Sequence, residues 1–251
     1  MPFFADIDDT EGDNGAHLHP VVNAFAFTKD HLERVVALNL VWSVQVVPLL
    51  IGLVWVQGWL WLRLVLMVAS LISMAITAGG LYGVIYQMYQ GEFLTKELVI
   101  DKYRELTRPG LRALLPLYAL YGLCPVLIIL GQISQVLSAQ ILTYYAALVV
   151  FACSIFWGPL FVEDPQKQSW QIGLRSFRLL WRYPVIMAGV GLMALMTLLF
   201  GIVSVGGFLL IAPSFIVVLQ TCLYGDIATK ESRRRSAHRR ITLNKQASSH
   251  I

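Results

Sequence analysis

Long apolar stretches alternate with short polar or charged segments along most of the chain. Six of these stretches are about 20 residues long, the length that an α-helix needs to cross a hydrocarbon core of roughly 30 Å. They predict membrane spans at residues 35–54, 64–86, 111–130, 141–162, 185–205 and 208–224. The pattern predicts an all-α, polytopic helical membrane protein, with six transmembrane helices arranged as three hairpins and with interfacial cytoplasmic helices between them.

The segment between the fourth and fifth predicted spans has the pattern of an amphipathic helix. Its aromatic residues recur at helical spacing on one stripe, at Trp170, Phe177 and Trp181. Its arginines share a neighbouring face, at Arg175, Arg178 and Arg182. Aromatic rings sit at headgroup depth and guanidinium groups meet anionic lipid. We therefore expect this helix to lie at the membrane–water interface.

Composition and charge agree with a membrane protein and give it an orientation. Hydrophobic residues make up 57% of the chain and charged residues only 14%, whereas soluble domains carry about a quarter charged residues. Every Lys and Arg except Arg63, and Arg112 at the inner end of the third predicted span, falls in the N-terminal segment, the two long connections or the C-terminal tail. The positive-inside rule places that face in the cytoplasm, so both termini are expected there.

The chain divides into an acidic disordered cytoplasmic arm (1–22), a six-helix transmembrane domain (23–228) and a basic cytoplasmic tail (229–251). The tail carries a cluster of arginines, at Arg233, Arg234, Arg235, Arg239 and Arg240. Basic clusters just beyond a span are attracted to anionic headgroups. Because no aromatic or glycine pattern accompanies the cluster, we expect it to bind lipid and not nucleic acid.

Local signals predict two helix boundaries. Thr28 has the character of an N-cap for a helix that continues through Leu32 into the first span. Pro109 and Gly110 predict the end of a short cytoplasmic helix in the connection 91–110.

Three amide side chains, Asn39, Gln45 and Gln220, fall inside predicted spans. Amides in hydrocarbon require partners, and a hydrogen bond to a neighbouring helix is the usual solution. The alternative is that they line a polar pathway. Small residues at Ala75, Gly79 and Gly83 share one face of the second span. They predict close packing against another helix, because small side chains let two backbones approach.

Motifs for chemistry are missing from the predicted spans. All five histidines lie outside them, so an intramembrane haem is not expected, and neither a metal nor any other cofactor is predicted. The sequence contains no H-E-x-x-H or P-loop motif. Acidic residues near the inner surface, Glu92, Glu163 and Asp226, leave a membrane enzyme as a third, weaker hypothesis.

The chain resembles the YesL-like family of bacterial integral membrane proteins, a domain of unknown function, over roughly residues 23–228. The resemblance rests on Asn39-Leu40-Val41-Trp42 with Pro48, on Thr77-Ala78-Gly79-Gly80-Leu81-Tyr82, on Gly91-Glu92 and on Arg175-Ser176-Phe177-Arg178. It implies a six-helix protein of the bacterial cytoplasmic membrane, with an accessory or regulatory role beside sugar-uptake systems. It brings no catalytic residues.

We therefore expect a non-enzymatic accessory, regulatory or assembly protein that contacts a membrane or cytoplasmic protein partner as well as anionic lipid. A homo-oligomer stays open. The alternative is a carrier or channel for an uncharged small solute, in which Asn39, Gln45 and Gln220 would converge on one hydrated cavity.

Overall fold

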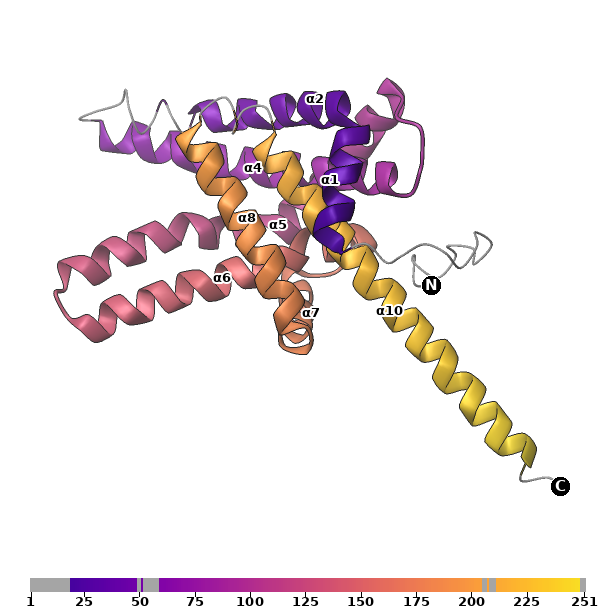
Figure 1. Cartoon of the computed structure of the whole chain (residues 1–251). Helices are drawn as coiled ribbons and strands as arrows, with labels where there is room; N and C mark the ends of the chain where they lie inside the picture. The colour runs from indigo at the N-terminus through magenta and orange to yellow at the C-terminus, as the bar shows by residue number, and fades with distance from the viewer. Residues whose placement is uncertain (1–18, 49–50, 52–58, 205–206, 208–210, 249–251) are drawn as a thin grey trace.

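A computed structural model describes residues 19–48, 51, 59–204, 207 and 211–248. Their regular structure is entirely helical (Figure 1). The elements are α1 (Pro20–Asp30), α2 (Leu32–Ser43), the 3₁₀ turn η1 (Val44–Val46), α4 (Leu60–Tyr89), α5 (Lys96–Ile133), α6 (Leu137–Glu163), α7 (Ser169–Arg182), α8 (Pro184–Val203) and α10 (Ala212–Ser248).

Four of the described helices are long and apolar enough to cross a membrane. The stretches are Trp61–Tyr89, Lys96–Ile133, Leu137–Glu163 and Pro184–Gly201. They contain the second, third and fourth predicted spans and most of the fifth. Parts of the first and sixth predicted spans lie outside the described residues, as does most of the predicted acidic arm.

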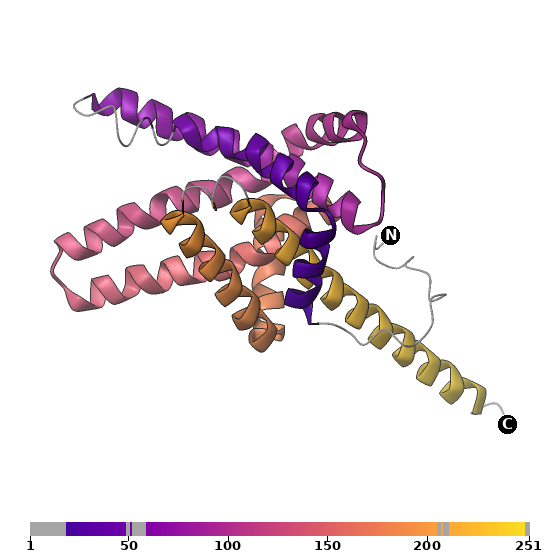
Figure 2. The same cartoon turned by 45° about the horizontal axis from the view of Figure 1, so that its top comes forward.

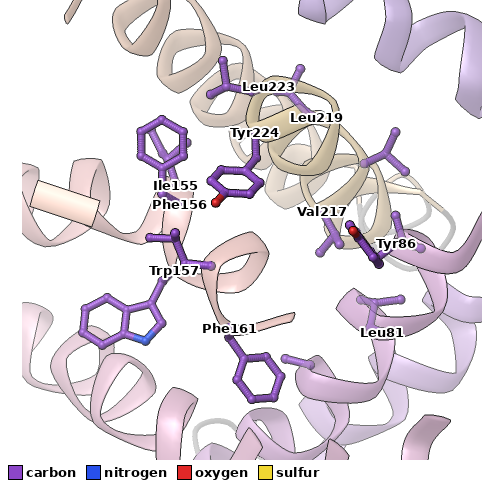
Figure 3. Packing of buried hydrophobic residues seen from close by; sticks show 14 of the residues in the cluster. Leu81, Tyr86, Ile155, Phe156, Trp157, Phe161, Val217, Leu219, Leu223 and Tyr224 are labelled. Carbon is purple, nitrogen blue, oxygen red and sulfur yellow. The ribbon is translucent and has the colours of Figure 1, made fainter. Parts of the chain in front are cut away.

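The core forms where α4, α6 and α10 meet. Figure 3 shows Leu81 of α4, Phe156 of α6 and Leu219 of α10 among the buried side chains of this cluster. Phe156 also contacts Tyr224, with ring centroids 6.4 Å apart. Because these residues come from three distant parts of the sequence, the core fixes how the hairpins sit against one another.

The hairpin of α4 and α5 is held by small residues. A Cβ atom added at Gly79 would lie 3.3 Å from the Cα atom of Gly110 and 3.2 Å from the carbonyl oxygen of Leu106. Ala75 is fully buried one turn away, and Gly83 faces the Leu106 side chain. The predicted small-residue face of α4 thus lies against α5, at backbone contact.

The predicted helix end at Pro109 and Gly110 is wrong, because α5 continues through both residues. A proline removes only one N–H from the helical ladder, and packing on both sides of it offsets that loss. Leu106, Gly110 and Leu117 are all buried on the same helix. The buried stripe runs across the proline, so α5 extends unbroken from the connection into the apolar hairpin.

The predicted N-cap at Thr28 is also wrong. Thr28 lies inside α1, and α2 begins after His31. The α1 helix starts earlier than predicted, at Pro20, where the His19 side chain accepts a hydrogen bond from the Val21 N–H at 3.4 Å. Proline favours the first position of a helix. This start signal lies two turns before Thr28, so Thr28 falls inside a helix that has already begun.

The ends of the helices lie on two opposite sides of the molecule. In Figures 1 and 2, the connection between α5 and α6 lies on the same side of the molecule as the start of α4. The α4–α5 connection and the C-terminal end of α10 lie on the opposite side. The α10 helix then extends well beyond the other helices, carrying the predicted basic tail as a continuation of the helix.

Candidate functional site

Two of the three amides that the sequence places in spans bond to other helices. The Asn39 side-chain oxygen on α2 accepts a hydrogen bond from the backbone N–H of Ser214 at 2.9 Å, in the first turn of α10. The first N–H groups of a helix have no intrahelical acceptor, so Asn39 supplies one from outside. The Asn39 amide nitrogen also donates to Ser43 at 3.4 Å. This buried amide therefore joins α2 to the start of α10.

Gln220 also joins two helices through its side chain. Its side-chain oxygen, buried on α10, accepts a short hydrogen bond from the Tyr82 hydroxyl of α4. Gln45 differs, because its side chain is partly exposed and it is its backbone carbonyl that accepts a bond from Ser70, at 2.7 Å. The structure thus distributes the three amides over different helix contacts.

The α7 helix presents its aromatic stripe outward. The side chains of Trp170 and Trp181 are 72% and 81% exposed, and Phe177 is also exposed. The opposite face, with Ile172, Ser176 and Leu179, is buried. The Ser176 hydroxyl donates a short hydrogen bond to the Cys153 carbonyl on α6. The exposed stripe therefore belongs to a helix that is fixed to the body by its other side.

Two of the arginines predicted to meet lipid pair with carboxylates of the protein. Arg175 forms a two-pronged ion pair with Glu163, with contacts of 2.6 and 3.2 Å. It also donates to the Tyr224 hydroxyl at 3.1 Å, and that hydroxyl donates to Glu163 at 2.6 Å. The three residues come from α7, α6 and α10. This inner polar cluster ties three helices together at one end.

The cluster changes the acidity of Arg175. Burial lowers its pKa, but the neighbouring Tyr224 and Glu163 more than compensate, so the pKa lies above its ordinary value. The Glu163 side chain is only 13% exposed. A carboxylate with so little contact with water requires a permanent counter-charge, and Arg175 provides it.

A second set of contacts extends the cluster along α10. Arg182 pairs with Glu231 at 2.8 Å, and the Tyr183 hydroxyl donates to the same carboxylate at 3.4 Å. Lys230 pairs with Asp226 at 2.7 Å. Arg178, in contrast, is exposed and forms no ion pair with a described residue. The described ion pairs thus leave Arg178 as the α7 arginine most open to lipid.

Sequence reasoning named Arg175 and Arg182 but missed their partners on α10. Tyr224 and Glu231 sit 49 positions from Arg175 and Arg182 respectively, and no local pattern indicates such a pairing. The side chains of the predicted lipid-binding arginines of the tail, Arg233–Arg240, lie outside the described ones. Among described residues, no group of three or more His, Cys, Asp or Glu could hold a metal ion.

Comparison with protein-family models, curated proteins and solved structures found no match. The resemblance to the YesL-like family therefore stays a prediction from the sequence.

Proposed function

We propose that this protein is a non-enzymatic accessory, regulatory or assembly component of a bacterial cytoplasmic membrane, which acts through contacts with another membrane or cytoplasmic protein. The observation that carries the proposal is the use of its intramembrane amides. Asn39 bonds to Ser214 and Gln220 bonds to Tyr82. Polar groups that satisfy one another between helices stabilise the bundle, and they leave fewer donors and acceptors for a solute.

The acidic residues considered for an enzyme support the same proposal. Both oxygens of Glu163 accept bonds from Arg175 or Tyr224, and Asp226 pairs with Lys230. A two-pronged ion pair fixes the relative position of both side chains. We therefore assign to these carboxylates the role of holding helices in place.

The proposed topology has six spans and both termini in the cytoplasm. The first span would comprise α2, η1 and the residues that follow, and the sixth would comprise the first turns of α10 up to Tyr224. Support comes from the positive-inside distribution and from the placement of the α4–α5 connection and the end of α10 on one side of the molecule.

The hairpin of α5 and α6 offers the surface that such a partner would contact. Its outer half stands apart from the other helices in Figures 1 and 2. Apolar side chains are exposed along both of its helices, including Ile129, Ile133, Leu142 and Tyr145. Inside a bilayer this surface meets lipid chains or another transmembrane helix, and an accessory protein would use it for the latter.

The solute carrier is the competing function. It requires Asn39, Gln45 and Gln220 to face one hydrated cavity, whereas two of the three bond to separate partners. Two results would distinguish a solute carrier from an accessory protein. Liposomes that contain the purified protein alone would take up an uncharged solute, and the Gln45→Leu variant would lose this uptake.

Site-specific crosslinking tests the accessory proposal. A photoreactive phenylalanine analogue would replace Leu142 on the exposed hairpin, and the control would carry it in place of Leu199 on α8, which is also exposed. Irradiation of native membranes is expected to yield a discrete protein adduct from position 142. Adducts to lipid alone at both positions would contradict the proposal.

A further inference from the structure

A basic pocket of about 810 Å³ lies between α5 and the connection from α6 to α7. Most of the residues that line it are polar or charged, among them Arg104, Glu105, Arg108, Arg112, Lys167 and Gln168. This pocket is separate from the inner polar cluster of Glu163, Arg175 and Tyr224. It lies in segments whose positive charge places them at the cytoplasmic face.

The positive charge of the basic pocket favours an anionic ligand. Arg104, Arg108 and Arg112 follow one another at successive turns of α5, and all three are exposed. None of them forms an ion pair with a residue that the structure describes. Guanidinium groups in a row bind phosphate oxygens through paired N–H donors.

The other charges of the pocket do not cancel these arginines. Glu105, the acidic residue of the lining, pairs with Lys102 at 2.8 Å. Lys167 pairs with Asp164 at 3.1 Å. The N-terminal turn of α7 also begins beside the pocket, after Gln168, and the N-terminus of a helix favours negative charge.

An apolar pocket of about 560 Å³ lies one turn further along α5 than the basic one. It lies between α5, α6 and α7, and its lining includes Leu120, Val149, Trp157, Trp170, Leu174 and Phe177. The outward aromatic stripe of α7 thus forms one wall of this pocket. Its position along α5 directs it toward the membrane interior.

One hydrogen bond joins the linings of the two pockets. The Ser169 hydroxyl, which lines the apolar pocket, donates to the carbonyl of Arg112 at 2.5 Å. Pro116 has no N–H to give to that carbonyl within the helix, so Ser169 takes its place. This bond holds the start of α7 against α5 and keeps the basic and apolar pockets side by side.

We propose that the paired pockets bind one anionic phospholipid, with its phosphate against Arg104, Arg108 and Arg112 and one acyl chain between α5, α6 and α7. A free phosphate compound would share the headgroup chemistry but would leave the apolar pocket unfilled. A zwitterionic lipid would fill the apolar pocket but would offer less charge to the arginines. The site does not depend on the partner proposed above.

Native mass spectrometry of the full chain in a neutral detergent tests the proposal. Phosphatidylglycerol, phosphatidylcholine and inorganic phosphate would be titrated separately. We expect one molecule of phosphatidylglycerol to bind saturably and more tightly than phosphatidylcholine. Because each basic residue near a membrane surface contributes roughly a factor of five, replacing Arg104, Arg108 and Arg112 together by Gln should weaken phosphatidylglycerol binding about 100-fold.

Matched variants separate the two halves of the site. Arg34→Gln removes an exposed arginine of α2 that lines neither pocket, and it should leave binding unchanged. Val149→Trp fills the apolar pocket and should weaken phosphatidylglycerol but not inorganic phosphate. Should the triple variant fail to fold, Arg108→Gln alone should still weaken binding by about five-fold.

Three results would overturn the proposal. One is equal binding of phosphatidylglycerol and phosphatidylcholine. Another is undiminished binding in the arginine variants, triple or single. The third is that inorganic phosphate binds as tightly as phosphatidylglycerol and that Val149→Trp weakens the binding of neither. That result would assign the basic pocket to a soluble phosphate compound.

Discussion

The Asn39 side chain and the Ser214 backbone N–H are 2.9 Å apart, although 175 positions separate them in the sequence. Asn39 lies on α2 and Ser214 in the first turn of α10. The bond therefore joins an early helix of the bundle to its last. It also explains why an amide is present in a predicted span, because a buried N–H at a helix start requires an acceptor.

Replacing Asn39 by Leu should destabilise the protein. The Ser214 N–H would be left buried without its acceptor, which costs about 1–3 kcal/mol. Thermal unfolding in detergent, followed by intrinsic fluorescence, should show a Tm lower by roughly 2–4 °C for each kcal/mol. Gln45→Leu is the control, since only the backbone of Gln45 bonds to Ser70. Equal Tm values for the two variants would refute this role of Asn39.

Replacing Gly79 by Val should loosen the α4–α5 hairpin. The new side chain would meet the Gly110 backbone at about the 3.3 Å that a Cβ alone would reach, and overpacking of this kind costs about 1–3 kcal/mol. Gly189→Val on α8 is the matched control, because a Cβ there meets nothing within 4 Å. Folded yield and Tm should fall for Gly79→Val alone, and a similar fall in both variants would contradict the packing.

Glu163 and Arg175 should behave as a coupled pair. Each single substitution, Glu163→Gln or Arg175→Gln, leaves the other charge partly buried without its counter-ion. The double variant should therefore lose less stability than the sum of the two single losses, with a coupling of about 0.5–3 kcal/mol. Denaturation in detergent measures all four proteins of the cycle. Strictly additive losses would mean that the ion pair contributes nothing.

Arg178→Gln is the control for that cycle, since Arg178 is exposed on the same helix. Its removal should leave the free energy of unfolding within about 0.5 kcal/mol of that of the unsubstituted protein, as for most surface changes.

The exposed tryptophans of α7 should contact lipid. In vesicles of brominated phospholipid, Trp170 and Trp181 should be quenched most strongly by bromine close to the headgroups, since both side chains are exposed on a helix that we expect at the interface. Trp157, 7% exposed and hydrogen-bonded to the Ala113 carbonyl, should be quenched less. Replacing Trp170 and Trp181 by Phe shows which part of the quenched fluorescence comes from these two residues. An unchanged quenching profile in Trp170→Phe/Trp181→Phe would place α7 away from the interface.

The features of the fold that depend on local pattern could be predicted from the sequence. The second to fifth apolar stretches correspond to helices long enough to cross a membrane, because length and hydropathy are properties of a continuous segment. The small residues around Gly79 indicated a packing face, since such spacing acts within one helix. The helix boundaries predicted at Thr28 and Pro109 were wrong, because burial of residues on α1 and α5 outweighs local capping and helix-breaking signals.

The contacts of the candidate site could not be predicted, because they depend on distant residues. Arg175 has the spacing of a lipid-facing arginine, and nothing near it in sequence points to Glu163 or Tyr224. The basic pocket was missed for the same reason. Its arginines on α5 form a pocket only together with the α6–α7 connection. Tertiary packing, and not proximity in the sequence, brings these two segments together.

The most direct measurement of the accessory role is the composition of the complex that the protein forms in its own membrane. The chain would be extracted from native membranes in a mild detergent and weighed intact by native mass spectrometry. We predict a second protein present in fixed stoichiometry, and its loss when the α5–α6 hairpin carries a bulky polar substitution such as Leu142→Arg. A solitary chain or a homo-oligomer, active in solute uptake after reconstitution, would contradict the accessory role.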